Sequence, residues 1–134
     1  MRLLKGKYNS HILCVSSLVY LFAGLVILEQ NLNLSILLFI VTIFSVLYHG
    51  NFHNFSLKAL DWVFGLILFV YVWYLFSVRF DVYIFVFLCV LLAFRLVDHF
   101  LFKTRRYGIF SYTHSFWHLL TGIIIVLLFI FIKT

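Results

Sequence analysis

Three histidines of this 134-residue chain stand at spacings that suit a metal ion. His114 and His118 are four residues apart, and on a helix such a pair shares one face, so both imidazoles can reach the same ion. His49 could add a third nitrogen from another segment. Three imidazoles with a fourth position left open are typical of catalytic zinc, whereas structural zinc sites are more often closed by cysteines. We therefore predict that Zn²⁺ is bound by His49, His114 and His118.

Two further polar residues are placed to act on a water molecule held by that ion. Ser45 precedes His49 by four residues, so the two share a helix face. Asp61 lies one turn into the next apolar segment. It could be a ligand, an outer partner of an imidazole, or the base that takes a proton from the water, and we favour the base. Ser45 could hydrogen-bond the water or the oxyanion that forms after attack.

The segments that must position these residues are strongly apolar. Of all residues, 66% are hydrophobic and 10% are charged, which is more apolar surface than a soluble domain of this length can bury. A helix needs about 20 residues to cross the bilayer core. Five runs approach that length. We predict an all-α membrane protein, one bundle of about five transmembrane helices over residues 1–134, with spans near 11–28, 34–49, 57–77, 82–99 and 112–132.

Individual residues predict where these helices begin, end and touch. Asparagine and serine favour N-cap positions, glycine favours the position just after a helix, and small residues let helices approach closely. Short connections make sequential helices antiparallel neighbours. The residues concerned are Asn9 or Ser10, Asn33, Ser56 and Ser111 as N-caps, Gly50 as the glycine after a helix, and Ala23, Gly24, Gly65 and Gly122 as points of close contact.

Positive charge is divided unevenly between the two sides of the predicted bundle. Seven basic residues lie on the side that holds the N-terminus and two lie on the other, which predicts a cytoplasmic N-terminus and a C-terminus across the membrane. All six histidines fall toward the N-terminal side, so the metal site should lie near the cytoplasmic face. The net charge of +6 thus reflects membrane orientation, and we expect no nucleic-acid partner. The basic residues are Arg2, Lys5, Lys7, Lys58, Lys103, Arg105 and Arg106 against Arg79 and Lys133.

The other polar residues predicted on the N-terminal side of the bundle can be interpreted in several ways. His11, His53 and His99 suit the membrane interface, and His11, His53 or Arg95 could contact a lipid headgroup. Arg95 and Asp98 are three residues apart and could form an ion cluster with His99. The sequence leaves these alternatives open.

The order Ser45…His49, Asp61 and His114…His118 resembles the CREST superfamily of membrane hydrolases, which includes alkaline ceramidases, adiponectin-receptor-like proteins and lipases that remodel GPI anchors. The stretch His114-Ser-Phe-Trp-His118-Leu-Leu-Thr-Gly122 is similar to the H-x-W-W-H-x-L-T-G stretch of alkaline ceramidases. The resemblance covers the second, third and fifth spans. It implies zinc on the three histidines, with Asp61 and Ser45 acting on the zinc-bound water. The superfamily has seven helices, so this chain would lack two, an even number that keeps His114 on the side of His49.

These features predict a zinc-dependent membrane hydrolase that cleaves an amide or ester bond of a lipid, either ceramide-like or an acyl lipid. The alternative is a receptor-like or regulatory membrane protein in which a structural zinc ties the spans together. A bis-histidine haem protein ranks lower, because haem ligands must face each other from different helices. The expected partner is a membrane lipid. A homo-oligomer stays open, since the two absent helices would have walled the lipid pocket.

Overall fold

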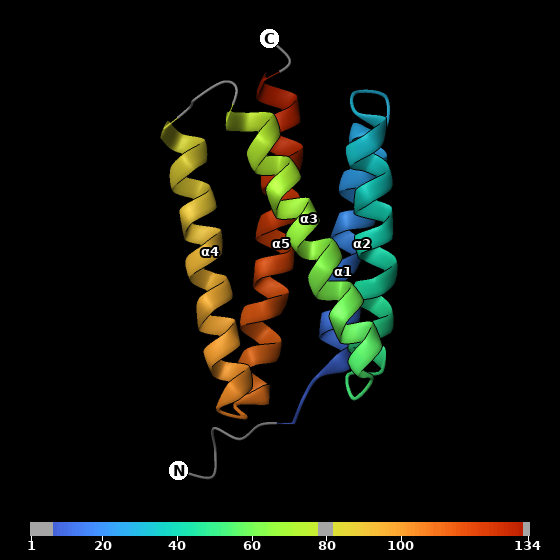
Figure 1. Cartoon of the computed structure of the whole chain (residues 1–134), viewed down its shortest axis with the longest axis vertical. Coiled ribbons are helices and arrows are strands. Elements are labelled where there is room, and N and C mark those ends of the chain that lie inside the picture. Colours follow the sequence, from blue (N-terminus) through green and yellow to red (C-terminus); the bar gives the residue numbers. More distant parts are fainter. Residues whose placement is uncertain (1–6, 78–81, 133–134) are drawn as a thin grey trace.

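The described part of the chain, residues 7–77 and 82–132 of a computed structural model, forms five helices and no strand (Figure 1). Each helix is long and apolar enough to cross a membrane, so the arrangement fits a multi-pass membrane protein. The predicted fold class is therefore confirmed. The helices are α1 (Ser10–Ile27), α2 (Leu32–Gly50), α3 (Phe55–Ser77), α4 (Val82–Lys103) and α5 (Tyr107–Ile132).

Several helix ends differ from the prediction. Asn9 caps α1 as expected, with its side chain accepting from the Ile12 amide. The cap of α2 is Asn31 rather than Asn33, and that of α3 is Asn54 rather than Ser56, whose place falls inside the helix. In each case an asparagine further upstream was available, and it adds residues to the helix.

The C-terminal half of the chain shows larger boundary differences. The fourth helix continues past His99 to Lys103, and the fifth begins at Tyr107, not 112. A tight turn with Arg105 at a φ of 58° separates them. Ser111 consequently lies within α5 and does not cap it, and its hydroxyl donates to the Tyr107 carbonyl. Gly50 is the last residue of α2, not the residue beyond it.

The helices alternate in direction. α1, α3 and α5 begin at one end of the bundle, where α2 and α4 finish (Figure 1); we call this the site end. Close packing joins α1 to α2 and α5, α2 to α3, and α4 to α5. α3 and α4 are antiparallel neighbours as expected, but they meet through side chains, such as Trp73 with Phe85 and Trp62 with Arg95, and both line a cavity.

The core runs along the middle of the bundle. α1 supplies Tyr20, Ala23 and Ile27, all buried, and α2 packs Leu34 and Leu38 against them. Many other apolar side chains of α3 and α4 are exposed in the isolated chain, as lipid-facing residues are: Val63, Ile67, Val70, Val86 and Val90.

Two of the predicted small-residue contacts are present. A Cβ atom at Gly24 would lie 2.6 Å from Phe39, and one at Gly122 would lie 2.7 Å from Val19. At Gly65 such an atom would meet nothing within 4 Å, so the prediction is wrong there.

Basic residues of the described chain gather at the site end. Lys7 precedes α1, Lys58 lies in the first turns of α3, and Lys103, Arg105 and Arg106 surround the turn from α4 to α5. The other basic residues used to predict orientation, Arg2, Lys5, Arg79 and Lys133, lie outside the described residues. Membrane orientation therefore stays a prediction.

Candidate metal centre

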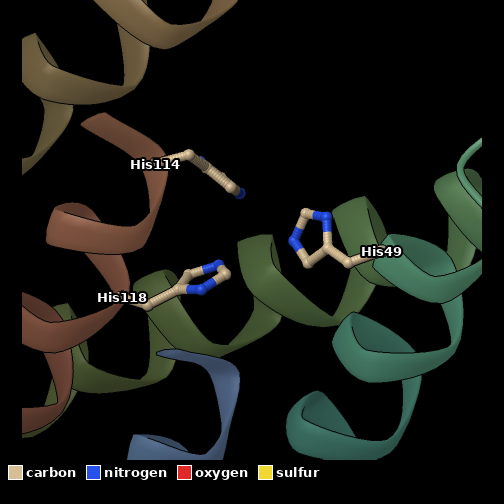
Figure 2. Close-up of side chains that lie close together, drawn as sticks. All are labelled: His49, His114 and His118. Atoms are coloured by element: carbon tan, nitrogen blue, oxygen red, sulfur yellow. The ribbon is translucent and has the colours of Figure 1, made fainter. Parts of the chain in front are cut away.

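The structure brings together the three histidines that the sequence singled out. His49 lies at the end of α2, and His114 and His118 lie on successive turns of α5. Their ligand nitrogens all lie within 4.8 Å of one another, and all three residues are buried. Figure 2 shows the rings turned toward a common centre. Their centroids lie 4.5 to 5.4 Å apart.

His114 is held by a buried carboxylate. Its Nδ1 lies 2.7 Å from Oδ2 of Asp98 on α4. Thr113 donates to the other carboxylate oxygen at 2.6 Å. A guanidinium nitrogen of Arg95 also lies 3.3 Å from His114 Nδ1, but one nitrogen cannot serve both, and the shorter contact makes Nδ1 a donor to the carboxylate. Nε2 of His114 is then left with a free lone pair.

His118 is held by a serine of α1. Its Nδ1 lies 2.9 Å from Oγ of Ser16 and 3.3 Å from Oγ of Ser17. The Ser16 hydroxyl donates its one hydrogen to the Leu13 carbonyl at 3.0 Å, so toward His118 it acts as acceptor. Nδ1 of His118 is therefore the protonated nitrogen, and the lone pair again lies on Nε2.

The hydrogen-bond partner of His49 is a residue that lies outside the helices. Its Nδ1 lies 2.7 Å from the hydroxyl of Tyr8, two residues before α1. Burial raises the pKa of Tyr8 well above its usual value, with a further contribution from nearby acidic groups, so the phenol keeps its proton. Nε2 of His49 is fully buried and has no hydrogen-bond partner. A buried nitrogen without a partner costs about 1–3 kcal/mol, and an ion at the common centre would satisfy it.

These contacts fit a bound metal ion. Histidine ligands usually donate their second ring N–H to a carboxylate, carbonyl or hydroxyl, which fixes the tautomer and points the other nitrogen at the metal. Here each ring has a carboxylate or hydroxyl oxygen within 2.9 Å of its Nδ1. Tetrahedral zinc at about 2.0–2.1 Å from each nitrogen needs ligand atoms about 3.4 Å apart, so small ring rotations would close the set around one ion.

Asp61 and Ser45 lie beside this cluster, as predicted. Ser45 is buried, and its Oγ lies 2.9 Å from Oγ of Ser17. Asp61 is half-buried. Both line a cavity of about 460 Å³ that also reaches His114 and His118. The wall away from these polar groups is apolar, with side chains such as Leu68 and Leu91.

Four residues of the cluster escaped sequence reasoning. Tyr8, Ser16 and Ser17 belong to the first segment of the chain, which the sequence did not connect to the site. The adjacent serines in an otherwise apolar run were a usable signal, because hydroxyls at membrane depth need partners. Asp98 was noted only as a member of a local cluster with Arg95 and His99. Its contacts are instead to His114 and Thr113 on α5.

The remaining candidates lie around the cluster rather than in it. His11, His53 and His99 are exposed. The Arg95 guanidinium lies over the ring of Trp62 at 4.7 Å, and Trp117 lies beyond at 5.6 Å. His99 packs its ring near the same Trp62.

Three comparisons with known proteins were negative. A scan against protein-family models, a search of the curated proteins and a search of the solved structures each find no match.

Proposed function

We propose that this protein is a zinc-dependent membrane hydrolase that cleaves an amide or ester bond of a lipid. One observation carries the proposal: three buried imidazoles, each oriented by a second partner, converge beside a cavity that holds a carboxylate and a hydroxyl. Ionisable groups at membrane depth are costly and mark functional sites. The similarity of the motif residues to the CREST superfamily supports the same chemistry, and membership of that superfamily is part of the proposal.

Each residue has a distinct role in this scheme. His49, His114 and His118 hold zinc, which would supply a Lewis acid that polarises a carbonyl and lowers the pKa of a water molecule toward about 7. Asp61 faces the cavity and takes a proton from the water, then returns it to the leaving group. Ser45 lines the same cavity as Asp61 and supplies a hydroxyl for the developing oxyanion.

The surroundings favour a lipid substrate. The cavity lies among helices of membrane-spanning length, and most of its wall is apolar. An acyl chain fits such a wall, because burial of each methylene contributes about 0.8 kcal/mol. With the N-terminus in the cytoplasm, the site end would face the cytoplasmic leaflet. Labelling of tags at residues 1 and 134 from each side of sealed vesicles tests this orientation.

The first experiment measures metal and turnover on the same preparation. Purified full-length protein should carry about one zinc per chain, and H118A should carry none. H11A is the matched control, since His11 is an exposed histidine near the same end and lines neither cavity. Zinc-loaded protein should hydrolyse at least one member of a panel of labelled ceramides and acyl lipids, and H118A should hydrolyse none.

The alternatives predict different results from that experiment. Stoichiometric zinc with no turnover of any lipid, and loss of thermal stability on chelation, would favour a structural zinc in a receptor-like protein. Absence of zinc from fresh preparations would refute the metal centre itself. A Soret band would indicate haem. The structure favours a single metal ion over a haem, because the centroids of the three imidazole rings lie within 5.4 Å of one another.

A further inference from the structure

A second cavity at the site end is rich in positive charge. It has a volume of about 380 Å³ and lies between the ends of α3, α4 and α5. Lys58, Lys103 and Arg105 line its rim, and Arg95 lines its deeper part together with Asp61 and Asp98. At 1.5 Å per residue, Arg95 lies roughly 12 Å below Lys103 along the axis of α4. Orientation in the membrane explains basic residues at a helix end, but it does not explain an arginine at that depth.

The charges of this cavity do not cancel. Four cationic side chains face two carboxylates, which leaves an excess of two positive charges when the histidines are neutral. Asp98 is already engaged by His114 and Thr113. Among the described residues no lysine or arginine forms an ion pair; Lys58 instead lies over the ring of Phe102, at 4.6 Å from its centroid. The cavity is therefore suited to an anion.

The basic cavity adjoins the apolar one. Asp61, Trp62, Arg95, His99 and His114 line both. From Asp61 the apolar cavity follows α3 to Phe69, eight residues or roughly 12 Å deeper. A molecule that filled both would place a charged group at the helix ends, an apolar chain in the bundle, and its middle next to Asp61 and His114.

We infer that the substrate is a lipid with a phosphate-bearing headgroup, which rests on the proposed hydrolase function for the word substrate but not for binding. The phosphate occupies the basic cavity, near Lys58, Lys103 and Arg105. Arg95 is held by Trp62 and Trp117, so its fork of donors is available to phosphate oxygens at little cost in side-chain entropy. The acyl chain enters the apolar cavity, and the bond between headgroup and chain lies at the junction.

The test compares binding of lipids that differ only in the phosphate. Full-length protein in maltoside detergent micelles, which contain no phosphate, is given either phosphatidic acid or the diacylglycerol with the same chains, and retained lipid is quantified by native mass spectrometry. We expect phosphatidic acid to bind at least tenfold more tightly. Two cations near an anionic group should contribute about ten- to thirtyfold, so K58Q/K103Q should lose most of the preference.

A matched control separates the cavity from general surface charge. K7Q/R106Q removes the same charge near the same end, and neither residue lines the cavity, so this variant should keep the preference. Equal losses in both double variants, or equal binding of the two lipids by the parent protein, would overturn the inference. Binding of glycerol 3-phosphate without binding of phosphatidic acid would assign the cavity to a soluble phosphate compound and overturn the lipid assignment.

Binding is measured without turnover, so the two proposals can fail separately. If freshly purified protein carries no zinc but retains phosphatidic acid, this inference stands and the zinc hydrolase is refuted. Turnover of uncharged lipids together with no preference for phosphatidic acid would refute this inference and leave the hydrolase standing.

Discussion

The pair formed by Asp98 and His114 gives the sharpest quantitative test of the metal centre. D98N keeps the shape of the side chain but replaces a carboxylate by an amide. The wild-type bond of 2.7 Å is between an N–H donor and a fully buried anion, and hydrogen bonds to charged groups contribute about 1.5–3 kcal/mol. Because the bond holds His114 in the tautomer that presents Nε2, its weakening should lower zinc affinity. We expect a loss of about 10- to 100-fold, as for other partners of metal-bound histidines.

The affinity is measured by competition with a fluorescent zinc chelator on detergent-solubilised protein. E29Q is the control, since it makes the same carboxylate-to-amide change at an exposed residue between α1 and α2, and it should bind zinc like the parent. Thermal unfolding of the metal-free proteins shows whether D98N still folds. If D98N folds and holds zinc as tightly as E29Q, then Asp98 does not orient a ligand and the tautomer argument is wrong.

Three smaller changes test the same reasoning elsewhere. Y8F removes the hydroxyl that lies 2.7 Å from Nδ1 of His49. A neutral hydrogen bond contributes about 0.5–1.5 kcal/mol, so chelator competition should show zinc affinity about two- to tenfold weaker; an unchanged affinity would mean that Tyr8 does not orient His49. G122A should lower the melting temperature, because the added Cβ would clash with the stiff side chain of Val19 at a cost of about 1–3 kcal/mol. G65A should raise the melting temperature, because its Cβ would meet no other atom and alanine favours the helix over glycine. A higher melting temperature for G122A than for G65A would contradict the helix contacts described above. Chelation should lower the melting temperature of the parent and leave that of H118A unchanged, since removing an ion that binds only the folded state destabilises that state, and equal shifts in both would show that the chelator acts elsewhere.

Sequence periodicity predicts what lies within one helix. The run of apolar residues predicts five helices, and the spacing of His114 and His118 places both on one face of α5; both expectations agree with the structure. Convergence of His49 on the same point was also predictable, because all three residues lie at one depth. These inferences need only the rise and repeat of a helix.

Contacts between helices depend on quantities that the sequence does not carry in any local pattern. The contact of Ser16 with His118 depends on the rotation of α1 about its axis between α2 and α5. The contact of Asp98 with His114, rather than with Arg95, depends on how α4 packs against α5. Tyr8 lies outside any helix, so no periodicity places it.

The distribution of the ligands along the chain has a consequence for biosynthesis. Two of the three histidines belong to α5, the last of the five helices to emerge during translation, while their partner His49 and its support Tyr8 lie in the first half. A nascent chain with four helices in the bilayer therefore presents one ligand and cannot capture the ion. If the three histidines bind a metal ion, its capture would have to wait until α5 has inserted and docked against α1, so metal uptake in cells would report that these helices have assembled.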